Sequence, residues 1–157
     1  MRLILIVALI AATLTGCDDT RVFEQNKDFS RREWTSADTV AFEFTITDAV
    51  PSYNLQCDIR NTLDYPWSRI FVNYVLEDST HKVMSSKLVG YYLFDVKTGE
   101  PQGDSGLGDI FDHRFPLLSN QKLAPGKYFV KLQQYMRTDT VPGILAAGVR
   151  VELAEQK

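Results

Sequence analysis

Hydrophobic and polar residues alternate with a period of two in several short segments of this 157-residue chain. The alternation is clearest in residues 53–60, where Tyr53, Leu55, Cys57 and Ile59 share one phase and polar residues fill the other. Successive side chains of a β-strand point to opposite faces, so this period predicts strands with one buried face. The same alternation predicts strands at residues 40–46, 70–76, 127–134 and 149–153.

Residues 88–94 are apolar in both phases, and we expect a further strand there. Turn residues such as Pro125-Gly126 and Pro142-Gly143 separate the alternating segments. No stretch of a dozen residues has helical periodicity. Short strands separated by turns predict an all-β fold, a single antiparallel β-sandwich of the jelly-roll or immunoglobulin-like kind. An early strand is expected at residues 21–24, because the segment that follows the N-terminus carries large apolar side chains that a free tether lacks.

The first sixteen residues have the features of a bacterial lipoprotein signal peptide. Arg2 provides a positive charge, and the apolar run at residues 3–12 is too short for the roughly 30 Å hydrocarbon core of a bilayer. The run ends in Leu14-Thr15-Gly16-Cys17, in which small residues precede a thiol that can accept a diacylglyceryl group. We therefore expect residues 1–16 to be removed, Cys17 to be lipidated, residues 17–20 to form a short tether and residues 21–157 to form the sandwich domain.

Charge and cysteine content narrow the classes of partner. The net charge is −3, and Lys and Arg do not cluster, which argues against nucleic acid and anionic lipid headgroups as partners. Once Cys17 carries lipid, Cys57 is the remaining cysteine, so no intramolecular disulfide can form. Cys57 lies in the apolar phase of its strand and is expected to be a buried, inert thiol.

The sequence offers little for catalysis. It has two histidines and no Gly-x-Ser-x-Gly nucleophile motif, and it lacks the spacing of a zinc site. We expect no enzymatic activity, no cofactor, no metal and no small-molecule substrate. Calcium is a minor alternative, because carboxylates gather on a glycine-containing connection. These carboxylates are Asp95, Asp104, Asp109 and Asp112.

Three segments are candidates for binding. In residues 106–114, two glycines flank an apolar residue, and charges of both signs follow; the alternative is a loop that leads into a strand. A partner or ligand surface there would comprise Gly106, Leu107, Gly108, Asp109, Asp112, His113 and Arg114. Gln133 and Gln134 are a second candidate for a partner surface. Tyr65 and Trp67 lie in a predicted loop and are candidates for stacking on a sugar ring.

Four blocks of this sequence resemble the gliding-motility lipoprotein GldH family of Bacteroidota. They are Arg21-Val22-Phe23-Glu24, Tyr53-Asn54-Leu55 leading to Arg60-Asn61, the block from Gly106 to His113, and Lys131 to Arg137 continuing to Pro142-Gly143-Ile144. The resemblance implies a membrane lipoprotein linked to gliding and type IX secretion. It implies no active-site residue and no cofactor. We expect the outer membrane, periplasmic face, as its location.

Two hypotheses for the function follow. The first is a non-catalytic assembly or scaffold lipoprotein, anchored by its acyl chains, that docks other envelope proteins of the gliding and secretion machinery through a sandwich face or an edge strand. The second is an envelope glycan-binding lipoprotein that uses Tyr65 and Trp67.

Overall fold

The computed structural model describes residues 18–155, and the alternating segments form eleven strands in this part of the chain. The expected signal peptide and Cys17 lie outside the described residues. No helix in residues 18–155 is long and apolar enough to cross a bilayer. The strands are β1 (Arg21–Asp28), β2 (Glu33–Thr35), β3 (Val40–Ile46), β4 (Tyr53–Thr62), β5 (Arg69–Asp78), β6 (Val83–Tyr92), β7 (Asp104–Ser105), β8 (Ile110–Gln121), β9 (Gly126–Gln134), β10 (Thr140–Pro142) and β11 (Ile144–Leu153).

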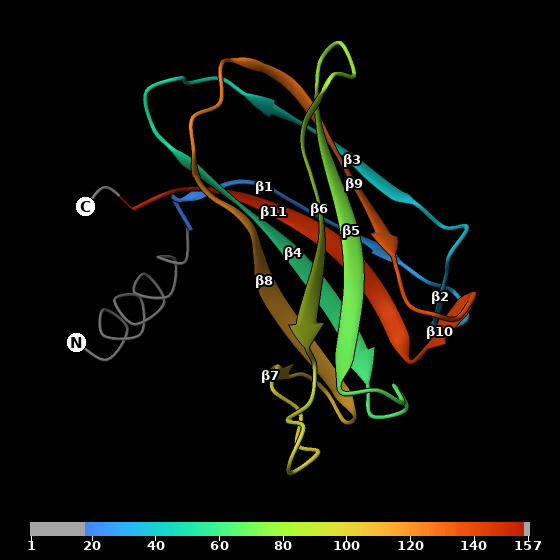
Figure 1. Ribbon diagram of the computed structural model, residues 1–157. Helices are drawn as coiled ribbons and strands as arrows, with labels where there is room; N and C mark the ends of the chain where they lie inside the picture. Colours follow the sequence, from blue (N-terminus) through green and yellow to red (C-terminus); the bar gives the residue numbers. More distant parts are fainter. Residues whose placement is uncertain (1–17, 156–157) are drawn as a thin grey trace, which may run out of the picture.

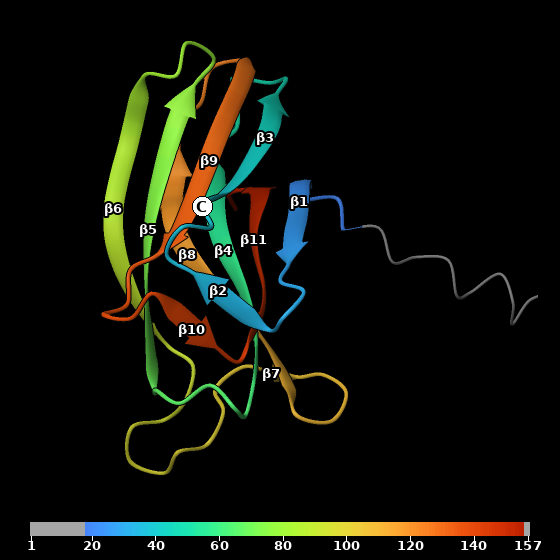
Figure 2. The ribbon, with the colours of Figure 1, turned by 90° about the vertical axis from the view of Figure 1, so that its right-hand side faces the viewer.

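Two antiparallel sheets pack face to face (Figures 1 and 2). One has the strand order β1-β11-β4-β8-β7 and the other has the order β3-β9-β5-β6. A short pair, β10-β2, lies at one end between them, as Figure 2 shows. The predicted all-β antiparallel sandwich is confirmed.

The core consists of the apolar phase of each strand. On β4, the side chains of Leu55, Cys57 and Ile59 are at most 1% exposed. Burying one such aliphatic side chain stabilises the fold by about 1.5–3 kcal/mol. Burial also raises the pKa of the Cys57 thiol, in agreement with the prediction that Cys57 is buried and inert. Trp34 of β2 is fully buried, and its indole N–H donates to the Asp38 carbonyl oxygen at 2.8 Å.

The structure corrects the bounds of one predicted strand and decides between two interpretations of another segment. The strand expected at residues 88–94 is β6, which starts earlier and is largely exposed because it pairs with β5 alone. For residues 106–114, the alternative of a loop that leads into a strand is confirmed, since β8 begins at Ile110 and pairs with β4 along its whole length. Charged residues fill the outward phase at the start of β8 and Pro116 interrupts it, so the alternation was not recognised.

Gly143 lies in the turn between β10 and β11 with a φ of 78°, a conformation that L-residues with a side chain adopt at a cost. A Cβ atom there would also approach the Tyr65 backbone nitrogen to 2.5 Å. Hydrogen bonds hold this turn on both sides. The Gly143 N–H donates to the Arg32 carbonyl oxygen, and the Gly143 carbonyl oxygen accepts the Thr62 N–H. It therefore joins the short β-pair to the end of β4.

We predict that Gly143→Ala lowers the free energy of unfolding by about 3 kcal/mol, from the left-handed backbone plus the steric overlap. Gly99→Ala is the matched control, since Gly99 has a similar φ of 73° and open space around it. It should cost about 1 kcal/mol. Denaturant unfolding measures both changes, and equal losses would show that the approach to Tyr65 is unimportant.

Candidate functional site

The outer face of the five-stranded sheet carries a network of paired charges. Arg150 of β11 is buried, with its side chain 7% exposed, and contacts three carboxylates. It is bonded to Asp18, donates to Glu24 at 2.7 Å and donates to Glu152 at 2.9 Å. Asp18 is the first residue that the structure describes, so the network holds the N-terminal end of the domain against the sheet.

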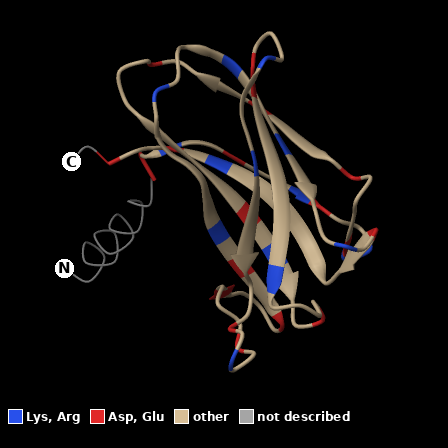
Figure 3. Cartoon of the chain, in the orientation of Figure 1, with Lys and Arg blue, Asp and Glu red and all other residues tan. Residues whose placement is uncertain are grey.

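The network extends across the sheet through two further arginines. Arg114 of β8 donates to both oxygens of Asp58, at 2.7 and 3.0 Å, and to Glu24 at 2.7 Å. Arg60 of β4 donates to Asp112 at 2.7 Å. Figure 3 shows these opposite charges interspersed over the strands of this sheet. Each arginine on this face already has a carboxylate partner within the chain.

Residues 106–114 do not form one site. Asp112 and Arg114 project outward into the charge network, whereas His113, in the opposite phase of β8, is buried and stacks on Phe115. Burial lowers the pKa of His113, and its Nε2 has no hydrogen-bond partner among the described residues. Gly106, Leu107 and Gly108 form an exposed turn, with Leu107 90% exposed, and Asp109 is exposed beside them. Of the expected group, Asp112, His113 and Arg114 line one cavity of about 350 Å³, whereas Gly106, Leu107, Gly108 and Asp109 do not line it.

The acidic connection has no arrangement suited to calcium. Within residues 18–155, no three His, Cys, Asp or Glu side chains lie close enough together to hold a metal ion. Asp95 instead accepts the backbone N–H groups of Lys97 and Thr98, both at 2.8 Å, as a turn residue does. Asp112 is bonded to Arg60.

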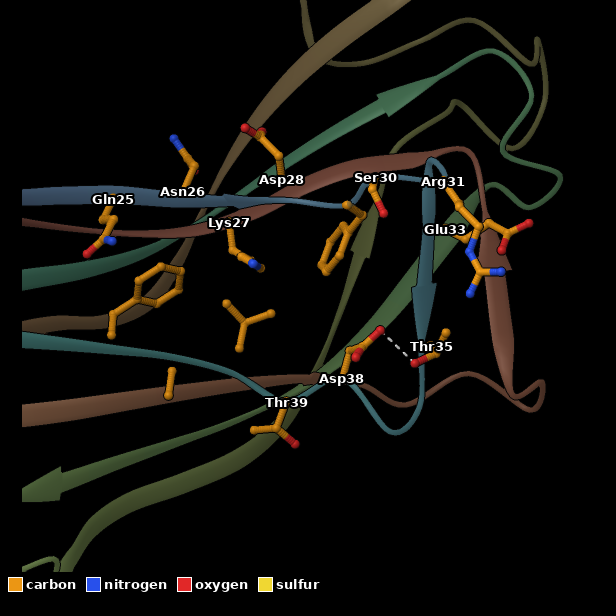
Figure 4. A pocket seen from close by; sticks show the side chains of 14 residues that line it. Gln25, Asn26, Lys27, Asp28, Ser30, Arg31, Glu33, Thr35, Asp38 and Thr39 are labelled. Carbon is orange, nitrogen blue, oxygen red and sulfur yellow. Dashed lines mark hydrogen bonds between the residues drawn. The ribbon is translucent and has the colours of Figure 1, made fainter.

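A wedge-shaped cavity of about 500 Å³ opens between the sheets at the edge formed by β1 and β3. Phe23 of β1 packs on Phe44 of β3, with ring centroids 5.9 Å apart, and closes this edge at one end. The next inward positions of β1 are Gln25 and Lys27, which are exposed. Figure 4 shows the polar residues of β1 and of the segment before β3 around this wedge, whose floor includes Val40 and Phe42. Polar residues in the inward phase leave the two sheets open here.

Both strands beside the wedge are sheet edges. β1 pairs with β11 alone, and β3 pairs with β9 alone. An edge strand presents unpaired N–H and C=O groups, which an added strand can satisfy. We did not predict this wedge from the sequence. The sequence feature that could have predicted the wedge is the change from apolar Phe23 to polar Gln25 and Lys27 at the inward positions of one strand.

An apolar groove of about 650 Å³ lies on the outer side of the four-stranded sheet. The exposed rings of Trp67 and Tyr135 form part of it, although 68 positions separate them in the sequence. Tyr65, which we had paired with Trp67 for sugar stacking, is 3% exposed and packs edge-on against Trp67 at 5.5 Å. Tyr65 thus supports the indole from inside and cannot stack on a ligand. The groove is lined by Trp67, Phe71, Leu88, Tyr135, Met136, Arg137 and Thr138.

Gln133 and Gln134 do not share a surface, because neighbouring strand residues face opposite sides. Gln134 is 1% exposed and shapes the loop that carries Tyr135. Its amide donates to the Thr138 carbonyl oxygen at 3.1 Å, and its oxygen accepts the Met136 N–H at 2.8 Å. Gln133 donates to the Ser36 carbonyl oxygen at 2.8 Å. Both glutamine side chains therefore hold neighbouring backbone segments through hydrogen bonds within the chain.

Comparisons with known proteins give one family. The model of the GldH lipoprotein family matches residues 21–151. The chain is 31% identical to the gliding motility lipoprotein GldH homolog of Christiangramia forsetii over 149 residues, covering 90% of this chain and 89% of that protein. It is 26% identical to the gliding motility lipoprotein GldH of Flavobacterium johnsoniae, covering 94% of each.

Similarity to solved structures is more distant. Infectious bursal disease virus VP2 in its subviral particle is 12% identical with a TM-score of 0.43, and the match covers 87% of this chain and 33% of that one. A family GH115 4-O-methyl-alpha-glucuronidase is 13% identical with a TM-score of 0.42, covering 90% of this chain and 18% of that one.

The attachment of Asp18 to Arg150 should depend on pH. The hydrogen bond from Arg150 lowers the pKa of Asp18 from 3.8 to about 2. A carboxyl group with a lowered pKa in the folded state stabilises the fold above its unfolded pKa and loses that effect as pH falls through its folded pKa. We predict that Asp18→Asn lowers the denaturant midpoint at pH 7, and that this difference disappears between about pH 4 and pH 2.

Asp19→Asn is the control, because the exposed Asp19 side chain has no hydrogen bond or ion pair with another described residue. It should leave the midpoint unchanged at every pH. A pH-independent difference for Asp18→Asn would contradict an ionic attachment.

Proposed function

Because the chain belongs to the GldH lipoprotein family, as its sequence blocks indicated, we propose that it is a non-catalytic assembly component of the gliding motility and type IX secretion apparatus. A gliding-motility lipoprotein of the cell envelope is what the family match establishes. The assembly role, the link to secretion and the identity of the partner site are our proposals.

The polar groups of the described residues mostly bond to one another, and this favours a binding role over catalysis. The arginines and carboxylates on the five-stranded sheet bond to one another across strands, which rigidifies the face. His113 is stacked on Phe115 and buried, and its Nε2 has no hydrogen-bond partner among the described residues. A general base needs a substrate-accessible position with an orienting partner, and His113 has neither.

The wedge between β1 and β3 is the observation that carries the proposal. Two free strand edges flank a cavity with an apolar floor, which suits an extended polypeptide segment better than a compact ligand. Such a segment would gain main-chain hydrogen bonds from an edge and would place alternate side chains against Val40 and Phe42. The partner is therefore an extended strand of another envelope protein.

The lipid anchor would set the position of this wedge. Asp18 is held by Arg150, and the Thr20 carbonyl oxygen accepts the Leu153 N–H at 2.8 Å, so the chain is fixed to the sheet directly after Cys17. We propose that acylated Cys17 holds the domain close to the outer membrane, on its periplasmic face. β1, which borders the wedge, begins four residues after the anchor.

We predict that deletion of the protein abolishes surface spreading and export of a type IX cargo, and that only the acylated form restores both. Two or three acyl chains are needed for long-lived attachment, so Cys17→Ala should release the protein from membranes and fail to restore either activity. Spreading assays, cargo immunoblots and membrane fractionation test this. Full rescue by the released Cys17→Ala protein would refute an anchored role.

We predict that filling the wedge leaves the protein stably folded but abolishes its function. The double variant Gln25→Phe and Lys27→Phe continues the inward apolar phase of Phe23 and should match or exceed the wild-type unfolding midpoint. It should nevertheless lose rescue of spreading and export, because the aromatic rings occupy the partner's place.

Thr45→Phe is the control for added bulk, since Thr45 faces solvent on β3. It should rescue fully. Normal rescue by a stably folded, wedge-filled variant would show that the partner does not bind there, whereas the anchoring experiment would still stand.

A further inference from the structure

The groove that contains Trp67 and Tyr135 has the composition of a protein-binding hot spot. Trp67 is 39% exposed, Leu88 46% and Tyr135 61%, and Arg137 at the rim is also exposed. Trp, Tyr and Arg side chains dominate the energetics of protein interfaces, where they fill or line pockets. The surrounding structure preorganises these groups: Tyr65 supports Trp67, and buried Gln134 holds the loop of Tyr135.

Arg69, at the start of β5, adds a positively charged group next to this groove, and its guanidinium lies on aromatic rings. Its guanidinium lies 4.7 Å from the ring centroid of Phe71 and 5.0 Å from that of Tyr92, within the range of cation–π attraction. The cross-strand neighbour of Phe71 is Gly90, and a Cβ atom there would lie 2.6 Å from Arg69 Nε. The glycine therefore leaves room for the guanidinium to lie flat on the sheet.

Neither Arg69 nor Arg137 is bonded to a carboxylate in the described part of the chain. Arg69 Nε is buried and has no hydrogen-bond partner there. The opposite outer face differs, because Arg150, Arg114 and Arg60 each bond to at least one carboxylate. The two arginines thus specify an anionic group in whatever covers this face.

We propose that the groove binds an acidic segment of a protein partner, which inserts an apolar side chain between Trp67 and Tyr135 and pairs its carboxylates with Arg69 and Arg137. A saccharide fits less well, because the wall of the groove is mostly carbon and would leave many sugar hydroxyls without hydrogen bonds. A bilayer fits less well too, because the groove lies on the four-stranded sheet, opposite the sheet that holds Asp18. In Figure 2 this sheet, with β5, β6 and β9, is turned away from the end of the chain that leads to the anchor.

This surface is separate from the wedge between β1 and β3, and the proposal does not depend on the wedge. The two sites lie on different parts of the sandwich and fit different occupants, an extended strand and an acidic segment with an apolar anchor. A chain with both would join two partners, or two parts of one partner, at a fixed distance from the membrane.

The test is site-specific photo-crosslinking of the full-length, anchored protein in the cells that make it. p-Benzoylphenylalanine replaces Tyr135 in one strain and Met84 in another; Met84 is 48% exposed on the same sheet, beyond the groove. We expect a protease-sensitive adduct from position 135 and none from position 84. Mass spectrometry of the adduct should place the crosslink within a segment that carries Asp or Glu beside an apolar residue.

Charge variants make the test specific. In the position-135 strain, Arg137→Gln and Arg69→Gln should each lower the adduct yield about tenfold, because a carboxylate in the partner loses its counter-charge. Trp67→Ala should lower the yield about thirtyfold, as expected for a hot-spot aromatic residue. Arg137 is exposed, so its variant provides the test even if Arg69→Gln fails to fold, which thermal unfolding of the purified variant would reveal.

Several results would overturn the proposal. They are equal yields at positions 135 and 84, a saccharide or lipid adduct that survives protease, a crosslinked segment without acidic residues, and yields that do not change in a well-folded Arg137→Gln protein. Loss of the adduct in the wedge-filled variant would show that one partner bridges both sites, and retention would show independent binding; the groove is supported in either case.

Discussion

The structure depends on burying one phase of β4 between two neighbouring strands and beneath the opposite sheet. β4 pairs with β11 on one side and β8 on the other, and its inward residues Leu55, Cys57 and Ile59 are almost fully buried. With no disulfide among the described residues, this burial must supply most of the stability. A slip of one residue would turn the inward residues of β4 to solvent and its polar residues inward, so the register is strongly fixed. The positions of every outward side chain on the sheet follow from that register.

Fixed register gives the arginines on the two outer faces different neighbours. On the five-stranded sheet, cross-strand neighbours bring arginines beside carboxylates, and the resulting network reaches Asp18 at the N-terminal end of the domain. On the four-stranded sheet, Arg69 has aromatic rings and a glycine as neighbours. The arginines of the first face are paired and fix Asp18 to the sheet, whereas Arg69 on the second face has no carboxylate partner among the described residues.

The open edge has a different origin, which is an interruption of the core pattern. β1 contributes Phe23 to the interior and then places Gln25 and Lys27 where further apolar residues would close the sandwich. The polar side chains remain exposed, and the wedge forms between two edges that have no strand partner. Natural sandwiches usually protect such edges, and an edge left open supports our proposal that the protein assembles with others.

The sequence by itself determined the strand class, most strand positions and the family, because alternation, turn residues and contiguous motifs are local properties of the chain. It also predicted that Cys57 is buried, from the phase of its own strand. The tertiary structure decided which distant residues meet. It brought Asp112, His113 and Arg114 to one cavity without the glycine turn before them, placed Tyr65 inside the core and joined Trp67 to Tyr135. It also left Arg69 without a carboxylate partner among the described residues. Strand pairing brings together residues that lie far apart along the chain, and no local pattern records which pairs form.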